Sequence, residues 1–409
     1  MTRRLRTLLF VCHRFPYPPD RGEKIRIWHV LRHLAQSHRV FLGCLTDDAR
    51  DRQYIPQVAG ICADMGCFPI DKRRQKLRAL ARVRPGRPLM LDYYDHAPLR
   101  RWIADIVARE TIDVAYVIST AMAPYVRDLA VPKILDMVDV DSEKWADYAT
   151  RNPFPARLVW GREARTLRNY EREAARDAAR TLLVTAPESE HFVRAVPDMN
   201  GRVLPLENGV DLDYFDPSAS RFAAPYPGAS TADGPWVTMV GNLDYWPNED
   251  AAIWMATSVL PRLRQSRTPP ANLAIVGANP GRAVLELGKL PGVLVTGRVD
   301  DVRPYLAHAD VVVAPLRIAR GVQNKVLEGM AMARPVVATQ QAFRGIRAEP
   351  GRDLLVADGE VAFANAIIAV LDGQHPGMGV AARNAVEAGY AWSRQMARLD
   401  TILAEILPP

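Results

Sequence analysis

The part of the sequence best equipped for chemistry is ARGVQNKVLEGMAMARPVVAT at 319–339. An apolar run precedes it and a β-branched run follows it, so a short helix is predicted between two buried strands. Gly321 lets the backbone turn tightly and approach a ligand. The helix then points its first N–H groups and the positive end of its dipole at that ligand, and Lys325 adds a cation in the first turn. These features predict a diphosphate site.

Glu328 follows Lys325 by three residues, so the two side chains share one face of the predicted helix. A carboxylate in this place can accept hydrogen bonds from two neighbouring hydroxyl groups, such as those of a ribose. The alternative is an ordinary salt bridge on a surface helix. We favour the ligand site because the helix lies between two buried strands.

The elements that must position these residues form a regular alternation along the chain. Short apolar runs alternate with amphipathic helical segments, which predicts βαβ units and parallel sheets. The segment 211–235 is rich in Pro, Ala, Ser and Gly and has no apolar period, so we interpret it as a linker. We therefore expect Rossmann-like domains at 1–210 and 236–390, with ligands between them at the carboxyl ends of the strands. An amphipathic helix at 391–409 is expected to pack back on the first domain.

The composition supports two domains and an anionic ligand. A chain of 409 residues is too long for one ordinary core, and 48% hydrophobic with 24% charged residues is typical of a globular protein. The net charge of +7 suits nucleotides or an anionic membrane surface. Four scattered cysteines argue against a disulfide framework and for a reducing, cytoplasmic compartment. No apolar stretch is long enough to span a bilayer.

Several motifs together make the chain recognisable. The stretch ADVVVAPLRIARGVQNKVLEGMAMARPVVAT resembles the donor-binding region of the retaining GT-B glycosyltransferases of the group 1, or family 4, type. ENGVDLDYFDP at 207–217 resembles the lead-in to their second domain, and FPYPPDRGEKIRIWHVLRHLAQSHRV resembles their first loop and helix. VDVDSEKW and GVQNKVLE are most similar to the sugar transferases associated with PEP-CTERM exopolysaccharide systems.

This resemblance implies a fold and a reaction. The fold is α/β of the GT-B type, with two Rossmann-like domains whose parallel sheets face a central cleft. The reaction is transfer of a sugar from a nucleotide-sugar, with retention, to a saccharide or lipid-linked saccharide. No metal and no cofactor are expected, since the nucleotide-sugar is a substrate. The resemblance implies donor-binding residues at these positions: Gly241, Asn242, Arg298, Val299, Gly321, Val322, Lys325 and Glu328.

The sequence departs from the family pattern at the donor site. The family has a glutamate that contacts the donor sugar where this chain has Arg320. Arg320 is therefore expected to bind a phosphate or an acidic sugar, and we count it with Lys325 and Glu328 as catalytic. The usual basic residues after the first strand of domain two are replaced by Asn242 and Asn248, so Arg317 is expected to help meet the charge of the diphosphate.

The first domain offers candidate acceptor-side residues in two loops. Arg21 and Gly22 lie in the first loop, where the alternative is a simple turn before a helix. Asp139, Asp141 and Ser142 follow a predicted strand, and the alternative is a helix cap. The Asp139–Asp141 spacing also occurs in metal-dependent GT-A transferases, but two Rossmann-like halves argue against that fold. His13 ends the first strand, and we interpret it as structural rather than as a ligand contact.

The segment 72–87 carries eight Lys or Arg residues interleaved with leucine and valine. One interpretation is a solvated helix, and the other is contact with the inner-membrane surface. Nucleic acid is not expected, because no recognised binding motif accompanies the basic residues. Two other functions stay open for the whole chain. These are another GT-B enzyme such as a sugar-nucleotide epimerase, and a non-catalytic nucleotide-sugar-binding subunit.

Overall fold

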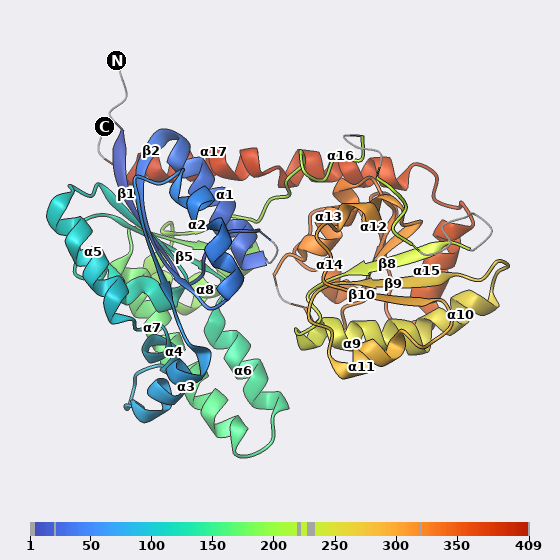
Figure 1. Cartoon of the computed structure of the whole chain (residues 1–409), viewed down its shortest axis with the longest axis horizontal. Helices are drawn as coiled ribbons and strands as arrows, with labels where there is room; N and C mark the ends of the chain where they lie inside the picture. The colour runs from blue at the N-terminus through green and yellow to red at the C-terminus, as the bar shows by residue number, and fades with distance from the viewer. Residues whose placement is uncertain (1–4, 20–21, 219–221, 227–233, 320, 408–409) are drawn as a thin grey trace. The chain divides into compact units, whose positions relative to one another are not determined.

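The chain folds into two units, each built on one parallel sheet (Figure 1). The computed structural model describes residues 5–19, 22–218, 222–226, 234–319 and 321–407. Unit 1 comprises Met1–Glu207 and Met396–Pro409, and unit 2 comprises Asn208–Gln395. The candidate residues Arg21 and Arg320, and the parts 219–221 and 227–233 of the expected linker, lie outside the described residues.

The described strands of unit 1 form a seven-stranded sheet in the order β3-β2-β1-β4-β5-β6-β7, with every neighbouring pair parallel. This order places the first strand in the interior of the sheet, next to the central strand β4. The strands are β1 (Arg6–Cys12), β2 (His38–Thr46), β3 (Asp64–Pro69), β4 (Val114–Ile118), β5 (Lys133–Val138), β6 (Arg180–Leu183) and β7 (Val203–Pro205).

Helices cover both faces of this sheet, which explains why its central strands are apolar along their whole length. On one face, Leu9 and Val11 of β1 share a core with Ile103 of α5. On the other, Phe10 stacks on Tyr116 of β4. The helices are α1 (Gly22–Ser37), α2 (Ile55–Ala59), α3 (Lys72–Ala81), α4 (Leu89–Tyr93), α5 (Ala97–Arg109), α6 (Asp141–Arg151), α7 (Ala156–Asp177) and α8 (Ala186–Ala195), with 3-10 turns η1 (Ala49–Tyr54), η2 (Thr120–Tyr125) and η3 (Pro197–Met199).

The described strands of unit 2 form a six-stranded parallel sheet in the order β10-β9-β8-β11-β12-β13. The strands are β8 (Trp236–Val240), β9 (Asn272–Val276), β10 (Val293–Gly297), β11 (Val311–Ala314), β12 (Val336–Ala338) and β13 (Leu355–Val356). The helices are α9 (Trp246–Trp254), α10 (Leu260–Gln265), α11 (Arg282–Leu287), α12 (Arg303–Ala307), α13 (Asn324–Ala331), α14 (Gln340–Phe343), α15 (Glu360–Leu371) and α16 (Met378–Tyr390), with a π turn η5 (Met255–Val259).

The last helix, α17 (Trp392–Ile406), begins in unit 2 and ends in unit 1. Within unit 1, Asp400 Oδ1 lies 2.8 Å from Nε2 of His33, and Glu405 accepts a hydrogen bond from Arg180. The segment expected to be a linker contributes to unit 2, where Phe215 and Tyr226 are buried. Among the described residues, no helix combines the length and the apolar character needed to cross a bilayer.

Candidate functional site

The start of α13 is where the sequence predicts a ligand cradle around Gly321, Lys325 and Glu328. After β11, Gly321 adopts the left-handed conformation with φ +62°, and α13 begins at Asn324. The N-cap residue Gln323 makes no side-chain cap hydrogen bond; its side-chain amide donates to Gly321 O instead. Val326 N donates to Gln323 O, so the cap residue leaves the amides of Asn324 and Lys325 to other partners. α13 packs closely on β11, because a Cβ at Gly329 would lie 2.8 Å from Val312 Cγ1.

Lys325 is held at this helix start by a residue from the other side of the sheet. Its ammonium group donates a hydrogen bond of 2.5 Å to Asn248 Oδ1 in α9. Asn248 is buried, and its amide is fixed because Nδ2 donates to Asn242 O at 2.8 Å. Asn242 and Asn248 thus take part in the site through the position of the lysine.

The surrounding protein shifts the pKa values of Lys325 and Glu328. Desolvation lowers the pKa of Lys325 to about 8, against the opposing charge of Glu328. Desolvation likewise raises the pKa of Glu328 to about 7, against the charge of Lys325. Both groups therefore change charge at a pH near 7. Shifted pKa values of this kind are typical of residues in a site that binds a charged or polar ligand.

The ends of β8 and β9 are built from glycines that bring two loops together. Gly241 follows β8, and a Cβ there would lie 3.0 Å from the side chain of Asn248. Gly277 follows β9, and a Cβ there would overlap the carbonyl oxygen of Gly241. Asn279, with φ +57°, directs its amide toward Asn242 Oδ1. The predicted residue Gly241 is thus required for the position of the lysine's partner.

We expect Gly277→Ala to destabilise unit 2 and to weaken ligand binding at the cradle, because the new methyl group must push the β8–α9 loop away. Overpacking of this kind typically costs about 1–3 kcal/mol. Denaturant unfolding gives the change in stability. The matched control is Gly389→Ala in α16, where a Cβ meets no atom within 4 Å. Equal stability of the two variants would show that the loops yield without cost.

The remaining donor-side candidates lie at neighbouring strand ends. Arg298 is exposed and Val299 is partly buried after β10, where Val299 packs near Tyr226. Val322 is buried in the core of unit 2, so only its backbone is open to a ligand. Arg317 forms a bidentate ion pair with Asp250, and its charge is therefore already balanced within the protein.

In unit 1, the ends of β1 and β2 and the start of α1 bring together a charged cluster. Arg14 Nε lies 2.6 Å from Glu23, and its NH1 lies 3.4 Å from Asp47. His13 Nε2 lies 3.3 Å from the carboxyl group of Glu23, while the buried Nδ1 of His13 has no partner among the described residues. Burial would raise the pKa of Glu23, but His13 and Arg14 outweigh it and hold the pKa well below its usual range.

The candidate residues that follow β5 differ in their exposure to solvent. Asp139 is exposed, yet surrounding protein and the charge of Asp141 raise its pKa to about 6. Ser142 is fully buried, and both its amide and its hydroxyl donate to Glu171 of α7. Burial raises the pKa of Glu171 to about 8. Ser142 therefore ties the start of α6 to α7, as a helix-terminal residue does.

Gly22 is the first residue of α1, next to Glu23. Sequence reasoning missed the His13–Arg14–Glu23–Asp47 cluster, although HR directly after a strand and E at a helix start were available signals. Among the described residues, no group of three or more His, Cys, Asp or Glu is arranged to hold a metal ion.

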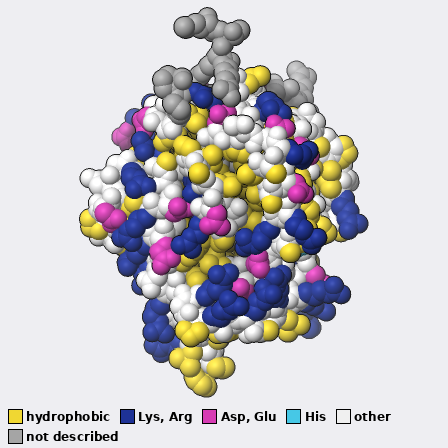
Figure 2. All heavy atoms as spheres, turned by 90° about the vertical axis from the view of Figure 1, so that its left-hand side faces the viewer, with side chains coloured by type: hydrophobic (Ala, Val, Ile, Leu, Met, Phe, Trp, Pro, Cys, Tyr) yellow, Lys and Arg dark blue, Asp and Glu magenta, His cyan; other side chains and the backbone are white. Residues whose placement is uncertain are grey.

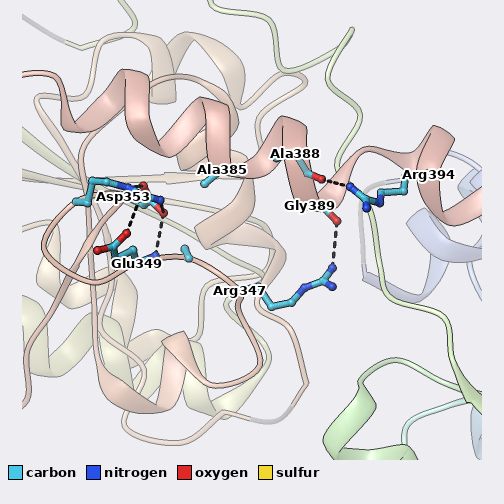
Figure 3. A pocket seen from close by; sticks show the side chains of 9 residues that line it. Arg347, Glu349, Asp353, Ala385, Ala388, Gly389 and Arg394 are labelled. Carbon is cyan, nitrogen blue, oxygen red and sulfur yellow. Dashed lines mark hydrogen bonds and ion pairs between the residues drawn. The ribbon is translucent and has the colours of Figure 1, made fainter.

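A separate cavity of about 490 Å³ in unit 2 is lined by residues whose polar groups form hydrogen bonds with one another (Figure 3). Arg347 and Arg394 donate to the carbonyl oxygens of Gly389 and Ala388 at the end of α16. Asp353 accepts from Arg352. None of the cradle residues lines this cavity. Arg347 and Arg394 therefore bond the C-terminal end of α16, and Asp353 balances the charge of Arg352.

The chain has the GT-B glycosyltransferase fold of two Rossmann-like domains with parallel sheets. It is similar to a sucrose-phosphate synthase from Thermosynechococcus elongatus, with a TM-score of 0.70 and 17% identity over 98% of each chain. It is similar to Anabaena HepE in complex with UDP and glucose, with a TM-score of 0.69 and 15% identity over 98% of this chain and 100% of that one. A glycosyltransferase from Rickettsia africae gives a TM-score of 0.68 and 14% identity over 99% of each chain.

The sequence comparison is more specific for one part of the chain. Residues 234–373 match the profile of the family described as glycosyl transferases group 1. This range contains the whole sheet of unit 2 and the complete cradle. Unit 2 thus contains the part of the chain that is similar to group 1 glycosyl transferases. No curated protein sequence is similar enough to the chain to count as a match.

Proposed function

We propose that the protein transfers a sugar from a nucleotide-sugar donor bound at the cradle of unit 2. The observation that carries this proposal is the helix start at Asn324, where Lys325 and Glu328 share one face and Asn248 holds the lysine. The family match over 234–373 supports the reaction class. Fold similarity to HepE, whose structure contains UDP and glucose, agrees with it.

Each cradle residue has a role in the proposed reaction. Lys325 and the amides of α13 stabilise the negative charge that grows on the diphosphate as the sugar leaves. Glu328 accepts hydrogen bonds from the ribose hydroxyls, and Arg298 and Val299 lie near the base. The reaction proceeds with retention and without a metal, and a donor phosphate oxygen takes the acceptor proton. Arg320 contacts a phosphate or an acidic sugar group.

Unit 1 binds the acceptor in this proposal, which is a saccharide or a lipid-linked saccharide of exopolysaccharide or cell-surface glycan synthesis. The charged cluster around Glu23 and the carboxyl groups of Asp139 and Asp141 offer hydrogen-bond partners for sugar hydroxyls. The similarity of VDVDSEKW and GVQNKVLE to the PEP-CTERM-associated sugar transferases supports this assignment. The protein acts in the cytoplasm.

We expect thermal denaturation to detect the donor. A nucleotide-sugar at 100 times its Kd should stabilise the protein by about 2.7 kcal/mol. The shift should occur with one base family and be lost in Lys325→Ala and Glu328→Ala. Lys289→Ala is the matched control, because Lys289 forms an exposed i,i+3 pair with Glu286 in the same unit.

Any of three results would redirect the proposal. If no nucleotide-sugar shifts the melting temperature with or without saccharide acceptors, the cradle does not bind a donor. If a nucleotide-sugar binds but is neither transferred nor hydrolysed, the protein is a binding subunit. Conversion of the donor to its epimer would identify the other class of GT-B enzyme.

A further inference from the structure

Helix α3 of unit 1 carries a basic and apolar outer surface. Its side chains at Leu77 and Leu80 are 68% and 58% exposed, and Val83 follows at 51%. Most of the surrounding basic residues are also exposed. Five of them pair with acidic side chains of unit 1, namely Lys72, Arg74, Arg78, Arg82 and Arg87. Among the described residues, Arg73, Lys76 and Arg84 form no side-chain ion pair. Exposed leucines between unpaired cations are the composition of a helix that lies in a membrane interface.

The hairpin of α6 and α7 presents a second apolar group. Phe154, in the turn between the two helices, is 78% exposed, and Leu158 and Val159 at the start of α7 are 63% and 40% exposed. Just inside the turn, Trp145 stacks on Trp160 with ring centroids 4.7 Å apart. Nε1 of Trp145 is buried, so this ring pair supports the exposed tip from within the hairpin.

Hydrogen bonds connect these two groups into one face. Arg162 of α7 donates to the carbonyl oxygens of Arg84 and Arg87, directly after α3. Leu158 lies one helical turn before Arg162, so both side chains share a face of α7. In addition, Glu163 accepts from the amides of Leu89 and Met90 at the start of α4. The surface therefore continues from α3 across 84–87 to the tip of the hairpin.

Figure 2 shows the same arrangement on unit 1. Lys and Arg side chains gather over the lower half of this face, and hydrophobic side chains project at its lowest point. Within unit 1, the α6–α7 hairpin is the element that reaches lowest in Figure 1. We define the docking face as α3, the segment 82–87 and the hairpin tip around Phe154 and Leu158.

We propose that the docking face binds an anionic lipid bilayer, with Phe154 and Leu158 entering the interface and the cations of α3 contacting lipid phosphates. Charge complementarity selects this occupant. The segment 72–87 contains eight Lys or Arg residues and no acidic residue, and the hairpin adds exposed Arg157 and Arg165. Juxtaposed cations of this kind bind negatively charged membrane surfaces, and the interaction weakens with salt. The proposal goes beyond sugar transfer and does not depend on it.

The first test is sedimentation of the full chain with vesicles of phosphatidylglycerol and phosphatidylethanolamine, and with vesicles of phosphatidylcholine alone. We expect binding to the anionic vesicles only. Arg73→Glu with Lys76→Glu should reduce the partition coefficient roughly tenfold or more. The control pair, Arg32→Glu with Arg398→Glu, changes the same number of exposed charges on α1 and α17 and should bind as the wild type does.

The second test addresses the hairpin tip. Phe154→Ser with Leu158→Ser should weaken binding at high salt, where the apolar contribution remains after the charges are screened. Val107→Ser, an exposed apolar position on α5, is the control. Size-exclusion chromatography of each variant shows whether it stays folded and whether its oligomeric state changes.

Three outcomes would overturn the proposal. These are failure to bind anionic vesicles, equal binding to phosphatidylcholine, and unchanged binding by both double variants. A hairpin variant that alters the oligomeric state but not vesicle binding would mean that the tip covers another protein copy instead. Vesicle binding is measured without any nucleotide-sugar, so its failure would leave the proposed transfer reaction untouched.

Discussion

The kcat/KM for the nucleotide-sugar is expected to follow a bell-shaped pH profile with apparent pKa values near 7 and 8. Glu328 must be a carboxylate to accept ribose hydrogen bonds, so activity rises as pH passes its raised pKa of about 7. Lys325 must be an ammonium to stabilise the diphosphate, so activity falls as pH passes its lowered pKa of about 8. Because the two groups interact, the measured values belong to the pair.

Substitutions separate the two limbs of this profile. Glu328→Gln should remove the rise near pH 7, since the amide does not titrate. Lys325→Arg should move the fall to much higher pH, and Lys325→Ala should lower kcat by about 10²–10³, as for loss of one preorganised donor. The fall in kcat itself should lie at higher pH than in kcat/KM, because a bound diphosphate favours the ammonium form.

The matched control for this experiment is Lys289→Arg, at an exposed lysine that pairs with Glu286. Its profile should match the wild type at every pH. A flat wild-type profile from pH 6 to 9, or a bell that persists in Glu328→Gln, would show that these two groups do not govern activity. The transfer reaction could then still occur, but with its electrostatics supplied elsewhere.

The fold was predictable from sequence wherever a strand is buried on both faces. The apolar runs at β1, β2, β4, β5 and β6, and those at β8, β9, β11 and β12, belong to strands covered on both faces, which leave continuous hydrophobic stretches in the sequence. The edge strand β10 also has such a run, although it is only partly buried. The other edge strands, β3, β7 and β13, were not recognised. In β3, Gly66 leaves room for Trp102, as a Cβ there would lie 2.7 Å from the indole. The formation of strand β3 depends on this packing and is not indicated by a pattern of hydrophobic residues in its own sequence.

The candidate site was predictable only where spacing along the chain fixes geometry. Lys325 and Glu328 lie three residues apart, so their common face followed from helical periodicity. The partnership of Lys325 with Asn248 joins residues 77 positions apart, and no local pattern reveals it. For Ser142, local sequence pointed to a different partner. A polar residue after a strand suggested a ligand contact, whereas its hydroxyl donates to Glu171.

The second large effect is expected from Asp136→Asn, which should lower the free energy of unfolding of unit 1 by about 3–5 kcal/mol. Asp136 and Arg26 are both fully buried. Arg26 Nε and NH2 donate to the carboxylate at 2.8 and 2.9 Å, and the hydroxyl of Tyr116 donates to it as well. Burial works to lower the pKa of Arg26, but the charge of Asp136 outweighs it, so the arginine stays charged.

The amide substitution leaves this guanidinium in the core of unit 1 without a counter-charge, which is why the expected loss is large. The control is Asp198→Asn, which breaks an equally well-formed ion pair with Arg176 at the surface, where water replaces the lost partner. Urea unfolding followed by circular dichroism compares the two. Arg26→Met combined with Asp136→Leu should be less destabilised than Asp136→Asn, because it removes both buried charges. If Asp136→Asn and Asp198→Asn unfold at the same urea concentration, the buried ion pair does not hold α1 to the sheet. The position of Glu23 at the start of α1 must then be maintained by its contacts with Arg14 and His13.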